Sequence, residues 1–242
     1  MTDTTSVEQL FEILISGDRP AARQYIEGVL ARGATAESLV TGLFWPTYEL
    51  IERLFRQDQL CTMSHHFAMR LLRVLVDQNA GRLSFEPSRG KTVLVACGSN
   101  EACDMGAQMA VDLLECAGFT VQFAGGGIAG DEILGRVNET KPDVLLMFCS
   151  APTDLPDIRQ LIDTIREINA CPHLQIAVGG GVFNRAEGLA EEIGADVWSK
   201  TPLDMVETII AEPERRATAS QRTVGKNQRK PSSATGSQRA AA

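Results

Sequence analysis

Two loops of the sequence combine residue types that bind or react with small molecules. The first, GSNEACDMGAQ at 98–108, follows the apolar run 92–97 and places carboxylates on both sides of Cys103. The second has three consecutive glycines at 179–181. Missing side chains let a flat or bulky group approach the backbone there, although a tight turn has the same requirement. Neither loop has the glycine pattern of a dinucleotide site or the lysine of a phosphate-binding loop.

The elements around these loops follow an α/β pattern from residue 91 onward. Short apolar runs alternate with amphipathic stretches, which predicts a parallel sheet covered by helices on both faces. Ligands of such sheets bind at the carboxyl ends of the strands, where both loops would lie. The expected strands are 92–97, 120–124, 143–148, 174–179 and 195–198, and the expected helices are near 105–117, 130–139, 155–169, 185–193 and 203–211.

Three further segments complete the chain. Residues 1–83 show helical periodicity and predict a bundle of four or five helices, one of which Pro46 should kink or break. Residues 84–90 are polar, with proline and glycine, and predict a linker before the domain at 91–211. Residues 212–242 nearly lack large apolar side chains and predict a disordered basic tail.

The loop residues also match a known motif. Cobalamin-binding domains carry D-x-H-x-x-G, then S-x-L, then 26–28 residues, then G-G. This chain resembles that family, with a helical cap in front, over about 91–211. The resemblance implies an N-terminal helical bundle plus a Rossmann-like, flavodoxin-like α/β domain with a parallel five-stranded sheet. The matching residues are Glu101, Ala102, Cys103, Asp104, Met105 and Gly106, then Ser150 and Pro152, then Gly179 and Gly180.

The resemblance implies roles for these positions. The nucleotide tail of cobalamin would enter a slot in the sheet beside Gly179 and Gly180, and Ser150 would offer its hydroxyl. Replacing Gly180 with leucine should then block the tail. Cys103 stands where the family has its cobalt-ligating histidine, which leaves three alternatives. Cobalt keeps benzimidazole or water below it, Cys103 binds it as a thiolate, or the site takes another ligand or none.

Above the corrin ring, the family places aromatic, acidic and histidine side chains from the helical cap. The corresponding stretch here contains Phe55, His65 and His66. The resemblance implies that one histidine faces the cobalt from above. The alternative is that both histidines are solvated residues at the start of a helix.

We therefore expect a cobalamin-binding regulatory or sensory module that acts through a partner protein. A corrinoid methyl carrier for a methyltransferase system is the first alternative, and a degenerate fold that binds haem or protein is the second. The expected partners are a corrinoid and a regulator or methyltransferase. No catalytic constellation is evident, so we do not expect an enzyme in its own right.

Composition narrows the remaining classes. The net charge is −8, yet seven basic and no acidic residues occur from Arg215 onward. An acidic body argues against direct nucleic-acid binding except through the basic tail. No run of about 20 apolar residues and no secretory signal is present, so we expect a cytoplasmic protein without membrane contact.

Overall fold

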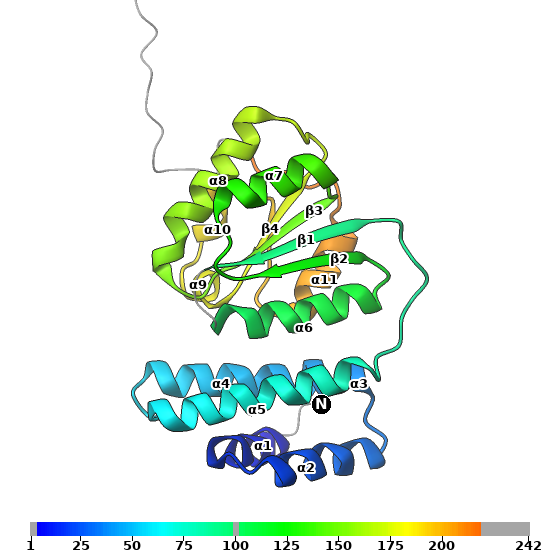
Figure 1. Ribbon diagram of the computed structural model, residues 1–242, viewed down its shortest axis with the longest axis vertical. Helices are drawn as coiled ribbons and strands as arrows, with labels where there is room; N and C mark the ends of the chain where they lie inside the picture. Colours follow the sequence, from blue (N-terminus) through cyan, green and yellow to red (C-terminus); the bar gives the residue numbers. More distant parts are fainter. Residues whose placement is uncertain (1–3, 99–101, 219–242) are drawn as a thin grey trace, which may run out of the picture.

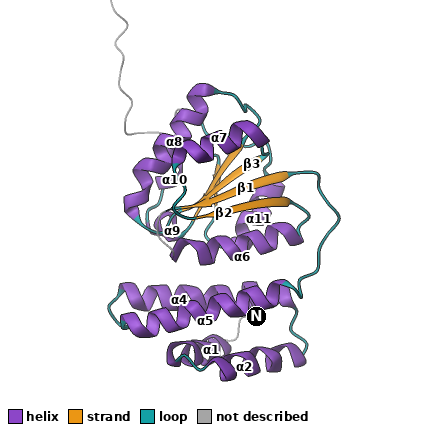
Figure 2. Cartoon of the chain, in the orientation of Figure 1, coloured by secondary structure: helices purple, strands orange, loops and turns teal. Residues whose placement is uncertain are grey.

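The computed structural model describes residues 4–98 and 102–218, and only the backbone of 102–104. A helical bundle and an α/β domain lie one above the other (Figure 1; helices and strands are distinguished in Figure 2). The bundle comprises α1 (Thr4–Ser16), α2 (Arg19–Ala31), α3 (Ala36–Leu39), η1 (Val40–Phe44), α4 (Trp45–Arg56) and α5 (Thr62–Ala80).

Pro46 does not break the helical path, one of the two outcomes expected for it, but the helix changes its hydrogen-bond pattern just before it. Helices α3 and α4 are joined by η1, a π-helical turn in which the Trp45 N–H donates to the Val40 carbonyl. The wider turn places Pro46 in the first turn of α4, where the N–H that proline lacks is not needed.

The α/β domain contains a five-stranded parallel sheet in the order β2-β1-β3-β4-β5. This order defines a doubly wound, flavodoxin-like sheet, as expected. Its strands are β1 (Thr92–Cys97), β2 (Thr120–Gly125), β3 (Val144–Phe148), β4 (Gln175–Gly179) and β5 (Val197–Trp198). Its helices are α6 (Ala102–Cys116), α7 (Gly130–Thr140), η2 (Pro152–Asp154), α8 (Leu155–Ile168), α9 (Gly181–Arg185), α10 (Leu189–Ile193) and α11 (Pro202–Ala211).

The single helix expected at 185–193 is instead two short helices, α9 and α10. Helix α9 ends at Arg185 because Ala186 is extended, with φ −129° and ψ 96°, and α10 begins after Gly188, which has φ +78°.

Helix α6 connects the two parts of the molecule. It lies between the sheet and the helices α4 and α5 (Figure 1). Its described side chains are buried on nearly every side, as expected for a helix that packs on both of its flanks. One continuous apolar core therefore includes Leu72 of the bundle, Leu114 of α6 and Leu146 of the sheet.

The predicted linker 84–90 is packed along the end of α6. The Glu86 N–H donates to the Cys116 carbonyl at 2.7 Å, and the Arg89 N–H donates to the Gly118 carbonyl at 2.8 Å. Gly118 has φ +85°, and a Cβ at this position would lie 2.3 Å from the Pro87 carbonyl oxygen. These contacts hold the connection between bundle and sheet in a defined path.

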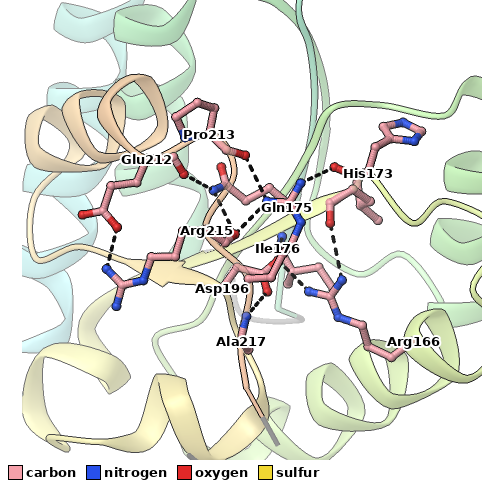
Figure 3. A network of polar contacts seen from close by, with 11 residues as sticks. Arg166, His173, Gln175, Ile176, Asp196, Glu212, Pro213, Arg215 and Ala217 are labelled. Carbon is pink, nitrogen blue, oxygen red and sulfur yellow. Dashed lines mark hydrogen bonds and ion pairs between the residues drawn. The ribbon is translucent and has the colours of Figure 1, made fainter.

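Residues 212–218, expected to belong to the disordered tail, are held against the amino-terminal edge of the sheet (Figure 3). The Asp196 carboxylate accepts the N–H groups of Ile176 and Ala217, both at 2.6 Å, and pairs with Arg166. The Gln175 side chain donates to the Glu212 carbonyl at 2.7 Å. Buried polar groups with these partners order a segment that composition alone marks as disordered. Residues 219–242 lie outside the described part of the chain.

Candidate functional site

A cleft lies between helix α4 of the bundle and the carboxyl ends of β3 and β4. It encloses about 230 Å³. Both parts of the molecule contribute side chains to it, and three of the residues singled out by motif, Gly106, Ser150 and Gly180, line it. The full lining is Trp45, Tyr48, Glu49, Glu52, Arg53, Arg56, Gly106, Phe148, Ser150, Gly180, Gly181, Asn184 and Arg185.

A larger cavity of about 510 Å³ lies on the opposite face of the sheet, between α7 and α8. Its lining is mostly apolar and includes Asp131, Asp154 and Asp157. None of the motif residues Ser150, Pro152, Gly179 and Gly180 lines it. The smaller cleft is therefore the candidate site.

Helix α4 presents one continuous face to the cleft. Its lining residues have the spacing i, i+3, i+4, i+7, i+8 and i+11, which places them on one side of a helix. Trp45 begins this face and lies over Gly106 of α6, where a Cβ would be 3.4 Å from the indole ring. The residues of this face were not identified from the sequence, although their spacing is visible there. They are Trp45, Tyr48, Glu49, Glu52, Arg53 and Arg56.

The indole nitrogen of Trp45 is a buried donor at the cleft. Its Nε1 is buried and has no hydrogen-bond partner among the described residues. A buried N–H without an acceptor costs about 1–3 kcal/mol. The Tyr48 ring lies 5.3 Å from the Trp45 ring, centroid to centroid, so two aromatic faces border the cleft at this point. A ligand with a polar edge would supply the missing acceptor.

On the sheet side, the loops after β3 and β4 are connected by Arg185. Its Nη2 donates to the Ser150 carbonyl at 2.8 Å. Gly180 has φ +104° and ψ 166°, a conformation that is essentially restricted to glycine. A Cβ there would lie 2.3 Å from the Cys149 carbonyl oxygen. Glycine is thus required at 180 by a contact with this chain's own backbone at Cys149.

The charges that line the cleft are of both signs. Glu52 accepts from His65 at 2.8 Å and lies 3.5 Å from Arg56. Burial raises the pKa of Glu49, an effect that Arg53 and Arg56 oppose. Burial, followed by the charge of Arg56, lowers the pKa of the Arg185 guanidinium. Aromatic faces with mixed charged groups suit a flat ligand that has polar groups around its edge.

Phe55, His65 and His66 lie beside the cleft and do not line it. The His65 ring stacks on Phe55, with centroids 3.9 Å apart, and its Nε2 is committed to Glu52. His66 is exposed. His65 therefore reaches the cleft through Glu52, and the direct position above the ligand predicted from the motif stays a prediction.

The predicted loop is described only in part. Glu101 lies outside the described residues, as do the side chains of Ala102, Cys103 and Asp104. Met105 is buried within the core, and Gly106 lines the cleft. Pro152 is exposed at the start of η2. Cobalt ligation by Cys103 stays a prediction.

Comparison with known proteins gives this fold and cleft a family. Residues 91–206 match the model described as B12 binding domain. A corrinoid protein of Desulfitobacterium hafniense is 28% identical over 120 residues, 50% of this chain and 54% of that protein. The trimethylamine corrinoid protein 2 of Methanosarcina mazei is 22% identical over 197 residues, 80% of this chain and 89% of its own. The chain thus spans about half the length of the first of these relatives.

The structure of the Methanosarcina barkeri monomethylamine corrinoid protein has the same fold. It superimposes with a TM-score of 0.71, at 14% identity, over 86% of this chain and 98% of that one. The α/β domain is a B12-binding domain. With the helical bundle in front of it, the chain is similar to corrinoid proteins over most of its length, and the B12-binding domain implies a corrinoid cofactor.

The chemical types of the residues that line the cleft suit the ring of a corrinoid. The unsatisfied Trp45 N–H and the mixed charges match the amide groups around a corrin edge. The volume of about 230 Å³ is below the range of ~300–1,000 Å³ typical of pockets for smaller ligands. The cleft as described is therefore smaller than a whole corrinoid requires.

The unsatisfied donor leads to a prediction about Trp45→Phe. This change removes the N–H and keeps an aromatic ring over Gly106. The free protein should be as stable as the wild type or slightly more stable, because a buried unpaired donor disappears. Affinity for hydroxocobalamin should fall about 5- to 20-fold, as for the loss of one hydrogen bond. Thermal melts of the free protein and absorbance titrations measure the two effects. An unchanged affinity would show that the indole N–H does not contact the corrinoid.

Proposed function

We propose that this corrinoid-binding protein is a methyl carrier for a corrinoid-dependent methyltransferase system. The observation that carries the proposal is the cleft shared by the bundle and the B12-binding domain. Support also comes from the relatives, which are named as corrinoid proteins for trimethylamine and monomethylamine. These names favour the carrier over the regulatory module that the sequence first suggested.

In this proposal the chain holds, orients and covers the cofactor. When bound, the corrinoid supplies a cobalt centre that accepts a methyl group and passes it on. Trp45 and Tyr48 cover one side of the cleft and exclude water, and the Trp45 N–H fixes the orientation of the ring edge. The pairing of Glu52 with His65 and Arg56 holds the middle of the α4 face in place.

The haem alternative has less support. A haem ligand would need a free imidazole nitrogen facing a cavity. His65 uses its Nε2 for Glu52, and its Nδ1 is buried without a hydrogen-bond partner among the described residues, but neither His65 nor His66 lines the cleft. The geometry of the two histidines therefore favours a structural role over iron ligation.

Reduction and methylation of the protein-bound corrinoid distinguish a carrier from a regulatory module. Protein loaded with hydroxocobalamin is reduced with titanium(III) citrate and treated with methyl iodide, while its absorbance is followed. We expect conversion to the methylated spectrum, and reversal when a thiol and a methyltransferase active on free methylcobalamin are added. A corrinoid that stays bound but cannot be methylated would contradict the carrier role.

A further inference from the structure

The last residue of β3, Phe148, occupies the space beside the glycine pair of the motif, Gly179 and Gly180. Phe148 pairs with Gly179 on one side and with Cys97 on the other. A Cβ at Gly179 would lie 3.1 Å from the Phe148 ring and 3.3 Å from the Met205 methyl group. Glycine at 179 thus makes room for two side chains of this chain.

The same ring also approaches α6. A Cβ at Gly106 would lie 3.9 Å from the Phe148 ring, and Met105 next to it is buried. Phe148 itself is 4% exposed, although it contributes to the lining of the cleft. Between the sheet, α6 and α11, the space at the strand ends is therefore filled by Phe148 and Met205.

This packing disagrees with a slot for the nucleotide tail of cobalamin at the same place. A tail entering beside Gly179 would need the Phe148 ring to leave the core. The ring is enclosed by neighbouring strands and two helices, so it has no free space on that side. Its displacement would also expose apolar surface that is now buried.

We propose that Phe148 is a specificity-determining residue that closes the sheet beneath the cleft. The chain then binds the corrin ring in the cleft and leaves the nucleotide outside the sheet. The ligand class is thus the corrinoid ring itself, with or without its nucleotide. This inference rests on the corrinoid binding in the proposed function.

Affinities for two corrinoids test the proposal. Cobalamin carries the nucleotide and cobinamide lacks it. The full-length protein is titrated with hydroxocobalamin and with diaquocobinamide, and the dissociation constants are read from absorbance. We expect the two constants to agree within about threefold, because the nucleotide makes little contact with the protein. Cobalamin binding at least tenfold tighter than cobinamide would overturn the proposal.

Variants that open the space make the test specific to Phe148. In Phe148→Ala, the ratio of the cobinamide dissociation constant to the cobalamin dissociation constant should rise at least tenfold. Phe148→Leu fills most of the space and should keep the wild-type ratio. Met205→Ala opens the same space from α11 and replaces Phe148→Ala if that variant does not fold, as judged by circular dichroism.

The remaining outcomes also decide the question. A wild-type ratio near one that no folded opening variant changes would overturn the role of Phe148. Failure of the wild type to bind either corrinoid would contradict the proposed function itself. If neither opening variant folds, the wild-type ratio alone decides the proposal.

Discussion

Gly180→Ala is expected to lower the free energy of unfolding by about 4 kcal/mol, within the range of severe single substitutions. Gly180 combines φ +104° with ψ 166°, and a Cβ would lie 2.3 Å from the carbonyl oxygen of Cys149 and 2.9 Å from its nitrogen. Both atoms belong to the backbone between β3 and η2, so neither can rotate away. The loop after β4 would have to move, and the cleft would lose one side.

Gly127→Ala is the matched control. Gly127 has φ +75°, but a Cβ there would meet no atom within 4 Å. Alanine should therefore cost only the conformational term of about 1–2 kcal/mol. Urea unfolding followed by circular dichroism measures both variants. Equal losses of stability would contradict the argument, because the contact with Cys149 would then add nothing.

The contact of residue 180 with the Cys149 backbone also changes how a bulky substitution at this position is interpreted. The sequence suggested that Gly180→Leu would block a slot for the cofactor. The structure predicts that such a variant fails earlier, through the backbone contact with Cys149. Lost corrinoid binding in this variant would report a disturbed fold and would not locate the nucleotide. Phe148 and Met205 are the positions that test the nucleotide directly.

Asp112→Asn is expected to stabilise the protein by about 2 kcal/mol at pH 7.5. Asp112 of α6 is 4% exposed, and one oxygen of its carboxylate accepts from Gln108 at 2.8 Å while the other has no hydrogen-bond partner among the described residues. Burial, with Glu115 and Asp77 of α5 adding repulsion, raises the pKa of Asp112 to about 6. A shift of about 2 units corresponds to at most ~3 kcal/mol. Asparagine keeps the acceptor for Gln108 and carries no charge.

The sign of the pH dependence follows from the raised pKa. The folded protein binds the Asp112 proton more tightly than the unfolded chain does. The stability that protonated Asp112 contributes is therefore fully present below about pH 4 and is lost as the pH rises through about 6. The advantage of Asp112→Asn should therefore be near its maximum at pH 7.5 and small at pH 4. Urea unfolding at the two pH values measures it. An advantage that is equal at both would show that burial of the charge is not its cause.

Much of the fold could be predicted from the sequence because its signals are local. The apolar runs that form β1, β3 and β4 are bounded by turn residues, and the structure places these strands within one residue of expectation. Errors arose where tertiary contacts override local preference. Residues 212–218 are ordered by Asp196 and Gln175, whereas Pro46 is accommodated locally, by the π turn at 40–44. Neither Asp196 nor Gln175 is near the tail segment in sequence.

The candidate site was predictable only on its sheet side. Gly106, Ser150 and Gly180 follow from motif spacing and do line the cleft. The α4 face was missed because its role depends on how the bundle sits on α6, which periodicity does not reveal. Trp45 and Arg56 show helical spacing that suits a core as well as a cleft. The motif likewise cannot tell whether the room beside Gly179 is taken by a ligand or by Phe148.

Corrinoid binding is the central claim, and an absorbance spectrum tests it most directly. The purified full-length protein is incubated with hydroxocobalamin, desalted and measured beside Cys103→Ala and Trp45→Phe. We predict that corrin bands are retained by the wild type in near-equimolar amount and are weaker in Trp45→Phe. A spectral shift that disappears in Cys103→Ala would make Cys103 a cobalt ligand. A colourless wild-type protein after desalting would contradict the account.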